Sequence, residues 1–184
     1  MGAAVDRFAH NSFALLAYAA IVRIYGLQLP PFDRAQGLWG FIDSMQSLLM
    51  SFGVTLVACL IGSRLPDWID SDRHPGHRGF GHSLLSLFIF ALIALIAFGY
   101  SVDQGLAVLY AVAFAAGYLS HLVLDFMTYE GAPWFWPLDE KYSLDLGPAG
   151  GLFVGSLGFL ALVLSIYLLA DRFLVAIVLL SRAG

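Results

Sequence analysis

The sequence has few charged residues and almost no cysteine. Only 12% of its 184 residues are charged, whereas 60% are hydrophobic, and the mean hydropathy is +0.82. A water-soluble domain of this length needs a more polar surface, so the composition excludes an ordinary soluble protein and indicates an integral membrane protein. The single cysteine, Cys59, lies in an apolar run, which excludes an intramolecular disulfide.

Basic residues are also scarce, and the formal net charge is −4. The chain therefore lacks the positive field that nucleic-acid binding requires, and we expect no nucleic-acid partner. The N-terminus lacks the strongly basic segment and the small-residue cleavage site of a signal peptide. We expect the whole chain to stay in the membrane as one domain, 1–184, whose oligomeric state the sequence leaves open.

Five stretches approach the ~20 apolar residues that cross a bilayer. They predict an all-α, polytopic membrane protein with about five transmembrane helices at 12–27, 44–61, 83–100, 105–127 and 152–169. Asp171 and Arg172 interrupt the last stretch, and 173–180 continue as a helical tail. The segments 62–82 and 128–151 are rich in Gly and Pro and are predicted to be loops.

Alternating crossings bring the polar motifs to one side of the membrane, which we call the motif face. The loop 62–82, the end of the helix 105–127, the loop 128–151 and the N-terminus with His10 all fall there. Basic residues near the membrane are more numerous on this face than on the other, which favours a cytoplasmic orientation. They are Arg7, Arg64, Arg73, Arg78 and Lys141 against Arg34, Arg172 and Arg182.

Two ionisable residues, His121 and Asp125, lie four residues apart inside a predicted membrane helix. This spacing places both side chains on one helix face. Ionisable groups at membrane depth cost several kcal/mol unless paired or bound, so they mark functional sites by default. The alternative is a hydrogen bond that packs helices together, worth about 0.6–2 kcal/mol.

The predicted loop 62–82 supplies further metal ligands. Its carboxylates are Asp67, Asp70 and Asp72, and its imidazoles are His74, His77 and His82. Histidine with carboxylate suits zinc, with manganese or iron as alternatives, better than magnesium or calcium. Together with His10, His121 and Asp125 there are enough ligands for one, two or more ions. His74 is most simply explained as a solvated side chain.

A bound divalent metal would provide hydrolytic chemistry by lowering the pKa of a water towards about 7. In this interpretation Asp67 or Asp125 bridges or orients the water, and Arg78 stabilises the oxyanion. Ser83 and Ser120 flank ligand candidates and would hydrogen-bond to them. The aromatic residues of 128–151 indicate an interfacial belt, or alternatively a lipid-facing wall over the site.

Four ordered motifs in the sequence resemble those of the YdjM family. They are Leu65-Pro-Asp, His77-Arg-Gly-Phe-Gly-His-Ser-Leu-Leu85, Gly117-Tyr-Leu-Ser-His-Leu-Val-Leu-Asp-Phe-Met-Thr128 and Gly131-Ala-Pro-x3-Trp-Pro137. The resemblance covers about 62–144 and adds an N-terminal histidine at His10. Members of this family are bacterial and archaeal membrane proteins, some under LexA control, described as metal-dependent hydrolases.

The resemblance implies remote kinship with zinc-dependent phospholipase C and an inner-membrane location. Carried over by motif, it implies a set of six metal ligands: His10, Asp67, His77, His82, His121 and Asp125. Two positions depart from the family pattern. The usual Pro-Asp-x-Asp has Asp67 and Asp70 three apart here, which puts Asp70 in doubt, and Gly81 stands where the family has Thr.

The leading hypothesis is a membrane metalloenzyme that hydrolyses an ester of a lipid-like or small-molecule substrate, in particular a phosphoester. A metal-independent lipid phosphatase is one rival, because His121-x3-Asp125 resembles the last element of the phosphatidic-acid phosphatase signature. The chain lacks that family's Lys-x6-Arg-Pro element. A non-enzymatic protein that binds or transports metal, or assists assembly, is the other rival.

Overall fold

The regular structure of the chain is helical. A computed structural model describes residues 2–25, 37–70, 78–138 and 140–182, and the statements below concern these residues. In chain order the elements are α1 (Gly2–Tyr25), α2 (Gly37–Leu48), the π-helix η2 (Leu49–Val54), α3 (Thr55–Asp70), the 3-10 turn η3 (Phe80–His82), α4 (Leu84–Gly99), α5 (Gln104–Met127) and α6 (Leu152–Arg182).

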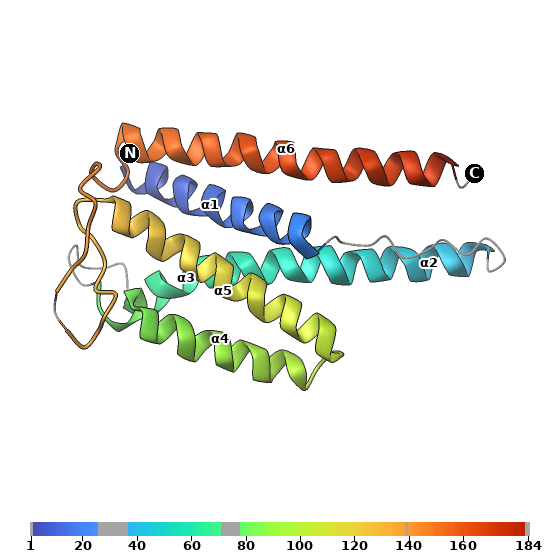
Figure 1. The fold of residues 1–184 in the computed structure, drawn as a ribbon, viewed down its shortest axis with the longest axis horizontal. Helices are drawn as coiled ribbons and strands as arrows, with labels where there is room; N and C mark the ends of the chain where they lie inside the picture. The colour runs from blue at the N-terminus through green and yellow to red at the C-terminus, as the bar shows by residue number, and fades with distance from the viewer. Residues whose placement is uncertain (1, 26–36, 71–77, 139, 183–184) are drawn as a thin grey trace.

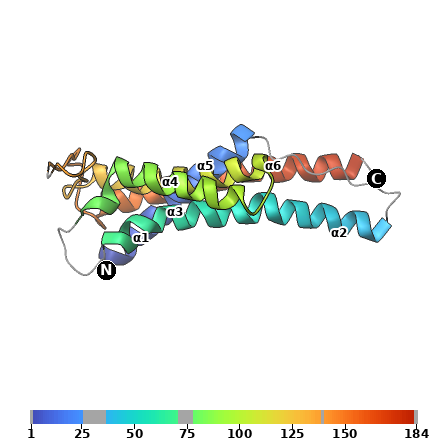
Figure 2. The same ribbon diagram turned by 90° about the horizontal axis from the view of Figure 1, so that it is seen from below.

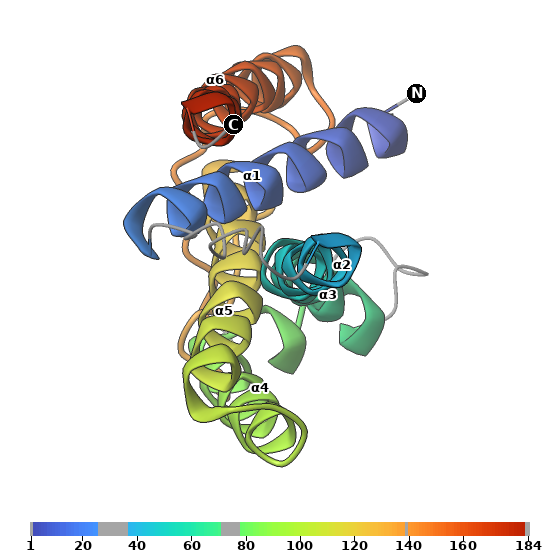
Figure 3. The same ribbon diagram turned by 90° about the vertical axis from the view of Figure 1, so that its right-hand side faces the viewer.

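The helices form an elongated bundle in which most long axes run in similar directions and α1 crosses the others obliquely (Figures 1 and 2). Seen from the end, α1 lies between α6 and the pair α3 and α5, and α5 lies between α1 and α4 (Figure 3). Helices α2 and α6 extend beyond the ends of α4 and α5 (Figure 1). The starts of α1, α4 and α6 and the end of α5 lie at the other end of the bundle (Figure 1).

Three described helical segments are long and apolar enough to cross a membrane: Met50–Asp70, Gln104–Met127 and Leu152–Ala170. Helix α4 is equally apolar but has only 16 residues. The chain is thus all-helical with three supported spans, and the predicted total of five crossings stays a prediction. Many large apolar side chains on α4 and α6 are exposed, as expected for surfaces that face lipid.

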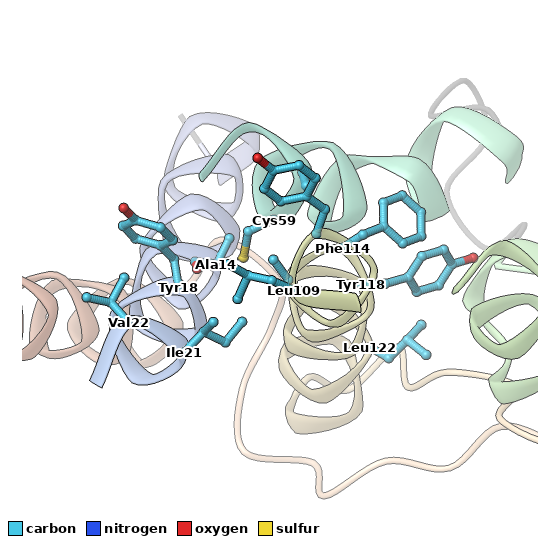
Figure 4. Packing of buried hydrophobic residues seen from close by; sticks show 12 residues of the cluster. Ala14, Tyr18, Ile21, Val22, Cys59, Leu109, Phe114, Tyr118 and Leu122 are labelled. Carbon is cyan, nitrogen blue, oxygen red and sulfur yellow. Dashed lines mark hydrogen bonds between the residues drawn. The ribbon is translucent and has the colours of Figure 1, made fainter. Parts of the chain in front are cut away.

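Helices α3 and α5 approach closely at two glycines. A Cβ atom at Gly62 would collide with the backbone carbonyl of Phe114, and one at Gly117 with that of Cys59. Small residues at a crossing let membrane helices pack backbone against backbone, where no hydrophobic force drives association. Around this crossing the buried core joins α1, α3 and α5, with Tyr18, Phe114 and Tyr118 as its large members (Figure 4).

The π-helix η2 leaves backbone carbonyls that the core tyrosines satisfy. Tyr110 donates to the carbonyl of Met50 over 2.9 Å, and Tyr18 donates to that of Phe52 over 3.3 Å. An unpaired carbonyl at membrane depth is costly, so these hydroxyls stabilise the irregular segment. The result is one continuous helical rod from α2 to the end of α3.

Helix α3 corrects the prediction that a loop begins at Gly62. The helix continues to Asp70 with Pro66 inside it. Proline and glycine favour turns in a sequence, but here Pro66 is buried and the segment packs against η3 and α5. Asp67 and Asp70 therefore stand on the last helical turns rather than on a loop.

The other predicted boundaries differ to varying degrees. Helix α1 begins at Gly2 rather than at 12, because the added turns carry polar residues such as His10, whose contact with Asp125 of α5 the hydropathy pattern does not reveal. Helices α4 and α5 lie within one residue of the predicted stretches. Helix α6 runs without a break through Asp171 and Arg172, so the predicted interruption is absent.

The described residues of the segment 128–151, namely 128–138 and 140–151, close the end of the bundle without forming a helix. An antiparallel bridge joins Ala132 to Tyr142, and Leu84 at the start of α4 donates its backbone N–H to the carbonyl of Trp134 over 2.9 Å. Figure 1 shows this segment beside the N-terminus and the end of α5. The polar motifs thus meet at one end of the bundle, as the alternating topology predicts.

Candidate metal centre

Donor groups from four separate elements meet beneath the segment 128–151. His121 and Asp125 lie on the last turns of α5 and are each only 1% exposed. His82 ends η3 and His10 lies on α1, and both are buried. Asp67, on the last turns of α3, is partly exposed and forms the more open side of the group.

The donor atoms lie at closely similar separations. The Nε2 atoms of His82 and His121 are 3.3 Å apart. Asp125 Oδ2 lies 3.2 Å from the first and 3.3 Å from the second. Asp67 Oδ1 lies 3.6 Å and 3.4 Å from the same two nitrogens. Two triangles of donors therefore share the edge between the histidines.

These separations match the coordination sphere of a small divalent ion. Tetrahedral zinc with bonds of about 2.0–2.1 Å keeps neighbouring ligands roughly 3.3 Å apart. Two groups among the described residues could hold an ion: the buried set of His10, His121 and Asp125, and the set of His82 and His121 with the partly exposed Asp67. The donor set of imidazole nitrogen and carboxylate oxygen is the one that zinc, manganese and iron accept.

Asp70 sets the orientation and the tautomer of His82. Its Oδ2 accepts a hydrogen bond from His82 Nδ1 over 2.6 Å, and its two oxygens also accept the backbone N–H groups of Gly79 and Gly81. A carboxylate only accepts, so Nδ1 carries the proton and the Nε2 lone pair is directed at Asp125 and Asp67. This carboxylate–histidine arrangement is the usual support of a metal ligand.

His10 is oriented by its own helix. Its Nδ1 donates to the backbone carbonyl of Asp6, one turn earlier, over 3.0 Å. A carbonyl only accepts, so the His10 Nε2 lone pair is directed at Asp125 Oδ1, 3.4 Å away. The His10 ring also lies against the ring of His121, with centroids 4.1 Å apart.

The geometry calls for a cation between these atoms. Among the described residues, no hydrogen bond reaches His10 Nε2 or Asp125 Oδ2, although both atoms are buried, whereas Asp125 Oδ1 is met by the guanidinium of Arg78 at 2.7 Å. Asp125 Oδ2 and His82 Nε2 are both acceptors in this tautomer, and two acceptors 3.2 Å apart repel unless they share a positive charge. A proton serves one such pair, whereas a divalent ion serves the whole set. The residues therefore fit a bound metal.

The carboxylates around His82 also raise the pKa of this histidine. Burial on its own would lower the pKa, but the hydrogen bonds to Asp67 and Asp70 and the charge of Asp125 outweigh it. Protons therefore compete with a metal ion for His82 at a higher pH than they would for an exposed histidine.

Arg78 is held by four oxygens of the protein. Its Nη2 lies 2.7 Å from Asp125 Oδ1 and 3.2 Å from Glu130 Oε2. Its Nη1 donates to the carbonyl of Gly131 over 2.7 Å and to Thr128 Oγ1 over 3.2 Å. The guanidinium thus joins the donor cluster to the segment 128–151. Its predicted oxyanion role stays a prediction.

The structure brings together five of the six residues implied as ligands: His10, Asp67, His82, His121 and Asp125. The sixth, His77, lies outside the described residues, as do His74 and Asp72. Sequence reasoning placed Asp70 in doubt, and the structure gives it the supporting role that the spacing did not reveal. Ser83 caps α4, and Ser120 donates to a backbone carbonyl of its own helix. Neither serine has a described hydrogen bond to a candidate metal ligand.

Comparison with known proteins identifies the family. The family model described as YdjM inner membrane protein matches residues 8–182. The chain belongs to the YdjM family. It is 30% identical over 136 residues to the inner membrane protein YdjM of Escherichia coli K12, covering 72% of this chain and 67% of that protein, and the Shigella flexneri protein of the same name gives the same values.

Membership in the YdjM family agrees with the apolar helices and assigns the chain to the inner membrane. No solved structure matches the chain. The matched region begins before His10 and includes every donor of the cluster, so the site lies within the part of the chain that defines the family.

Proposed function

We propose that this YdjM-family protein is a membrane-embedded, metal-dependent hydrolase. Its substrate would be an ester of a lipid-like molecule, in particular a phosphoester, and its metal would be zinc, or else manganese or iron. The observation that supports this most is the buried carboxylate of Asp125, whose Oδ2 lies 3.2 and 3.3 Å from the Nε2 atoms of His82 and His121. A structural hydrogen bond needs one such partner rather than two.

A divalent ion in this position supplies a water of lowered pKa and a positive charge. The chain's own residues prepare the site for it. Asp70 and the Asp6 carbonyl keep the His82 and His10 lone pairs directed inward, so no reorientation accompanies binding. Asp67 is the ligand closest to solvent, so its second oxygen is the group best placed to accept a proton from an attacking water.

Arg78 favours an anionic substrate. Its contact with buried Asp125 is short, whereas its contact with Glu130 is longer and involves a carboxylate that is 53% exposed. Exposed ion pairs contribute little, so a substrate oxyanion can replace Glu130 at Arg78 Nη2 at small cost. A phosphoester carries negative charge and a pair of oxygens that the planar guanidinium can bind bidentately.

A lipid-like substrate is supported by the surface next to the cluster. The segment that covers the site exposes apolar side chains at the membrane end of the bundle: Tyr129, Phe135, Trp136, Leu138, Leu144 and Leu146. Aromatic side chains favour the depth of lipid headgroups. Phe80, within η3, packs edge-on against Trp136, which links this surface to the turn that carries His82.

The test combines elemental analysis with turnover of the purified protein in detergent or nanodiscs. We expect bound metal, and hydrolysis of short-chain phosphoester substrates that stops on chelation and returns on adding the metal back. His121→Ala and Asp125→Ala are expected to lose both metal and turnover, while the exposed Asp43→Asn on α2 retains both. Intact metal content and turnover in either alanine variant would refute the proposal.

A structural metal is the second candidate. Sites closed by protein donors alone are typical of structural metals, and here the donors would tie α3, α5 and η3 together. In that case chelation lowers the melting temperature, and no ester is hydrolysed by the loaded protein. Measuring stability and turnover on the same preparation separates the two functions.

A further inference from the structure

We infer that Tyr118 is a positioning residue for the metal ligand His82, whose hydroxyl group holds His82 at the right separation from His121. The inference rests on the metal site of the proposed function, and it holds whether that metal is catalytic or structural. It concerns the placement of one ligand and does not depend on how many ions bind. Tyr118 acts through the backbone of Gly81 and does not contact the ion.

Two hydroxyl groups surround the buried carbonyl of Gly81, which directly precedes His82 in the chain. Tyr118 on α5 donates to this carbonyl over 2.5 Å, and Ser86 on α4 lies 3.1 Å from it. The Ser86 hydroxyl has shorter contacts, of 2.8 Å, with the carbonyl of Ser83 and with the Tyr118 oxygen. A hydroxyl group has one proton to donate, so Tyr118 is the main donor to the Gly81 carbonyl.

The Tyr118 hydrogen bond joins the turn η3 to the helix that carries His121. Tyr118 and His121 are three residues apart on α5 and therefore share a helix face. Ser86, by contrast, lies on α4, which follows η3 in the chain, and its contact joins residues only five apart. Among the described residues, the Tyr118 bond is the one that joins η3 to α5 without using a candidate ligand.

The same turn is held against α3 from its other side. The N–H group of Gly81 donates to Asp70 Oδ1 over 3.0 Å. A Cβ atom at Gly81 would lie only 2.8 Å from the carbonyl oxygen of Pro66, so the peptide rests directly on α3, the helix that also carries Asp67. The peptide before His82 is thus fixed between α3 and α5, and losing either support shifts the imidazole that follows it.

Loss of the tyrosine hydroxyl is expected to separate metal affinity from stability. In Tyr118→Phe the Ser86 proton turns to the Gly81 carbonyl, which stays satisfied, so the loss of stability is modest. The link to α5 is lost, and the separation of 3.3 Å between the Nε2 atoms of His82 and His121 is no longer maintained. Groups that orient a metal ligand contribute about 10–100-fold in affinity, and the lower end applies because Tyr118 acts through a peptide.

The experiment compares Tyr118→Phe with Tyr110→Phe, a matched control on the same helix. The Tyr110 hydroxyl also donates to a backbone carbonyl, that of Met50, over 2.9 Å. Tyr110 precedes His121 by eleven residues, which is about 16 Å along the helix. Neither substitution changes a charge, and each removes one tyrosine donor.

Two measurements are made in detergent. Competition against a chromophoric chelator gives the zinc affinity, and the visible absorption bands of bound Co²⁺ report the geometry of the ligands. We expect about tenfold weaker zinc binding and shifted cobalt bands in Tyr118→Phe, and wild-type values in Tyr110→Phe. Ser86→Ala keeps the Tyr118 bond to η3 and is expected to lose less zinc affinity than Tyr118→Phe.

Unchanged zinc affinity and cobalt bands in Tyr118→Phe would overturn the inference. An equal loss of affinity in Tyr110→Phe or Ser86→Ala would also overturn it, because the effect would then not depend on the link between η3 and α5. The melting temperature of each metal-free variant is measured alongside. A metal-free Tyr118→Phe that is unfolded contradicts the expected separation of affinity from stability.

The outcomes also distinguish this inference from the proposed function. Weaker zinc binding in Tyr118→Phe, with no hydrolysis by the loaded wild-type protein, removes the hydrolase and leaves the positioning role. Hydrolysis by the wild-type protein, with equal zinc affinity in Tyr118→Phe, does the reverse. A wild-type chain that binds neither zinc nor cobalt refutes the metal site on which the inference rests.

Discussion

Replacing Asp70 by asparagine tests whether the site is built to hold a metal. The substitution keeps the size of the side chain but replaces one accepting oxygen with an amide donor. Both oxygens of Asp70 accept hydrogen bonds: Oδ2 from His82 Nδ1 and Gly79 N, and Oδ1 from Gly81 N. In either orientation, the amide of the variant therefore meets an N–H group.

The expected loss is in metal affinity. If the amide faces His82, the imidazole must accept at Nδ1, and its proton moves to Nε2, where it blocks the metal. If it faces Gly81, the turn that carries His82 loses a hydrogen bond. Partners of this kind contribute about 10–100-fold in metal affinity. That range corresponds to about 1.4–2.7 kcal/mol.

The assay is a competition titration against a chromophoric zinc chelator in detergent, with Asp43→Asn as the control for loss of one carboxylate charge. Asp43 is exposed on α2, and α2 lies towards the end of the bundle opposite to the cluster (Figure 1). We expect a larger dissociation constant for zinc in Asp70→Asn and an unchanged one in the control. A lower melting temperature of the metal-free variant with unchanged zinc affinity would refute the reasoning. Asp70 would then stabilise the turn without supporting the metal ligand.

Three further outcomes follow from the same contacts. Gly117→Ala, whose Cβ would collide with the α3 backbone, is expected to lower the free energy of unfolding by about 1–3 kcal/mol or more, whereas Gly99→Ala, with nothing within 4 Å, leaves the melting temperature nearly unchanged. Metal affinity is expected to be constant at high pH and to fall as the pH drops through the raised pKa of His82, because protonation of its Nε2 excludes the ion. The fall is expected to begin above the ordinary histidine pKa of about 6.5. An affinity that stays constant down to that pH would contradict this prediction. Tyr118→Phe removes one of two donors to the buried carbonyl of Gly81, the other being Ser86 Oγ at 3.1 Å, and is expected to cost about 0.5–1.5 kcal/mol in thermal or denaturant unfolding.

Much of the site could be predicted from local patterns. The spacing of His121 and Asp125 places both on one face of α5 in any helix, and the alternation of apolar helices brings His10 and His82 to the same end. These conclusions need only the helix repeat and the length of a bilayer crossing. The number of crossings is less well determined, because α1 carries polar residues and α4 is short.

The supporting contacts could not be predicted in this way. Pro66 and the glycines around it indicate a loop, yet α3 continues to Asp70 because its last turns pack against η3 and α5. Only this continuation brings Asp70 to His82 Nδ1. The family spacing, which expects the second acidic residue one position earlier, pointed away from Asp70.

The sequence by itself determined that the chain lies in a membrane, which stretches are helical, and which residue types are available as ligands, because hydropathy and helical periodicity are local properties. The tertiary structure decided which donors face one another. Separations such as the 3.2 Å between His82 and Asp125, and the 2.7 Å between Arg78 and the same carboxylate, join segments more than forty residues apart. They depend on how α1, α3 and α5 cross, and the close approach at Gly62 and Gly117 sets that crossing.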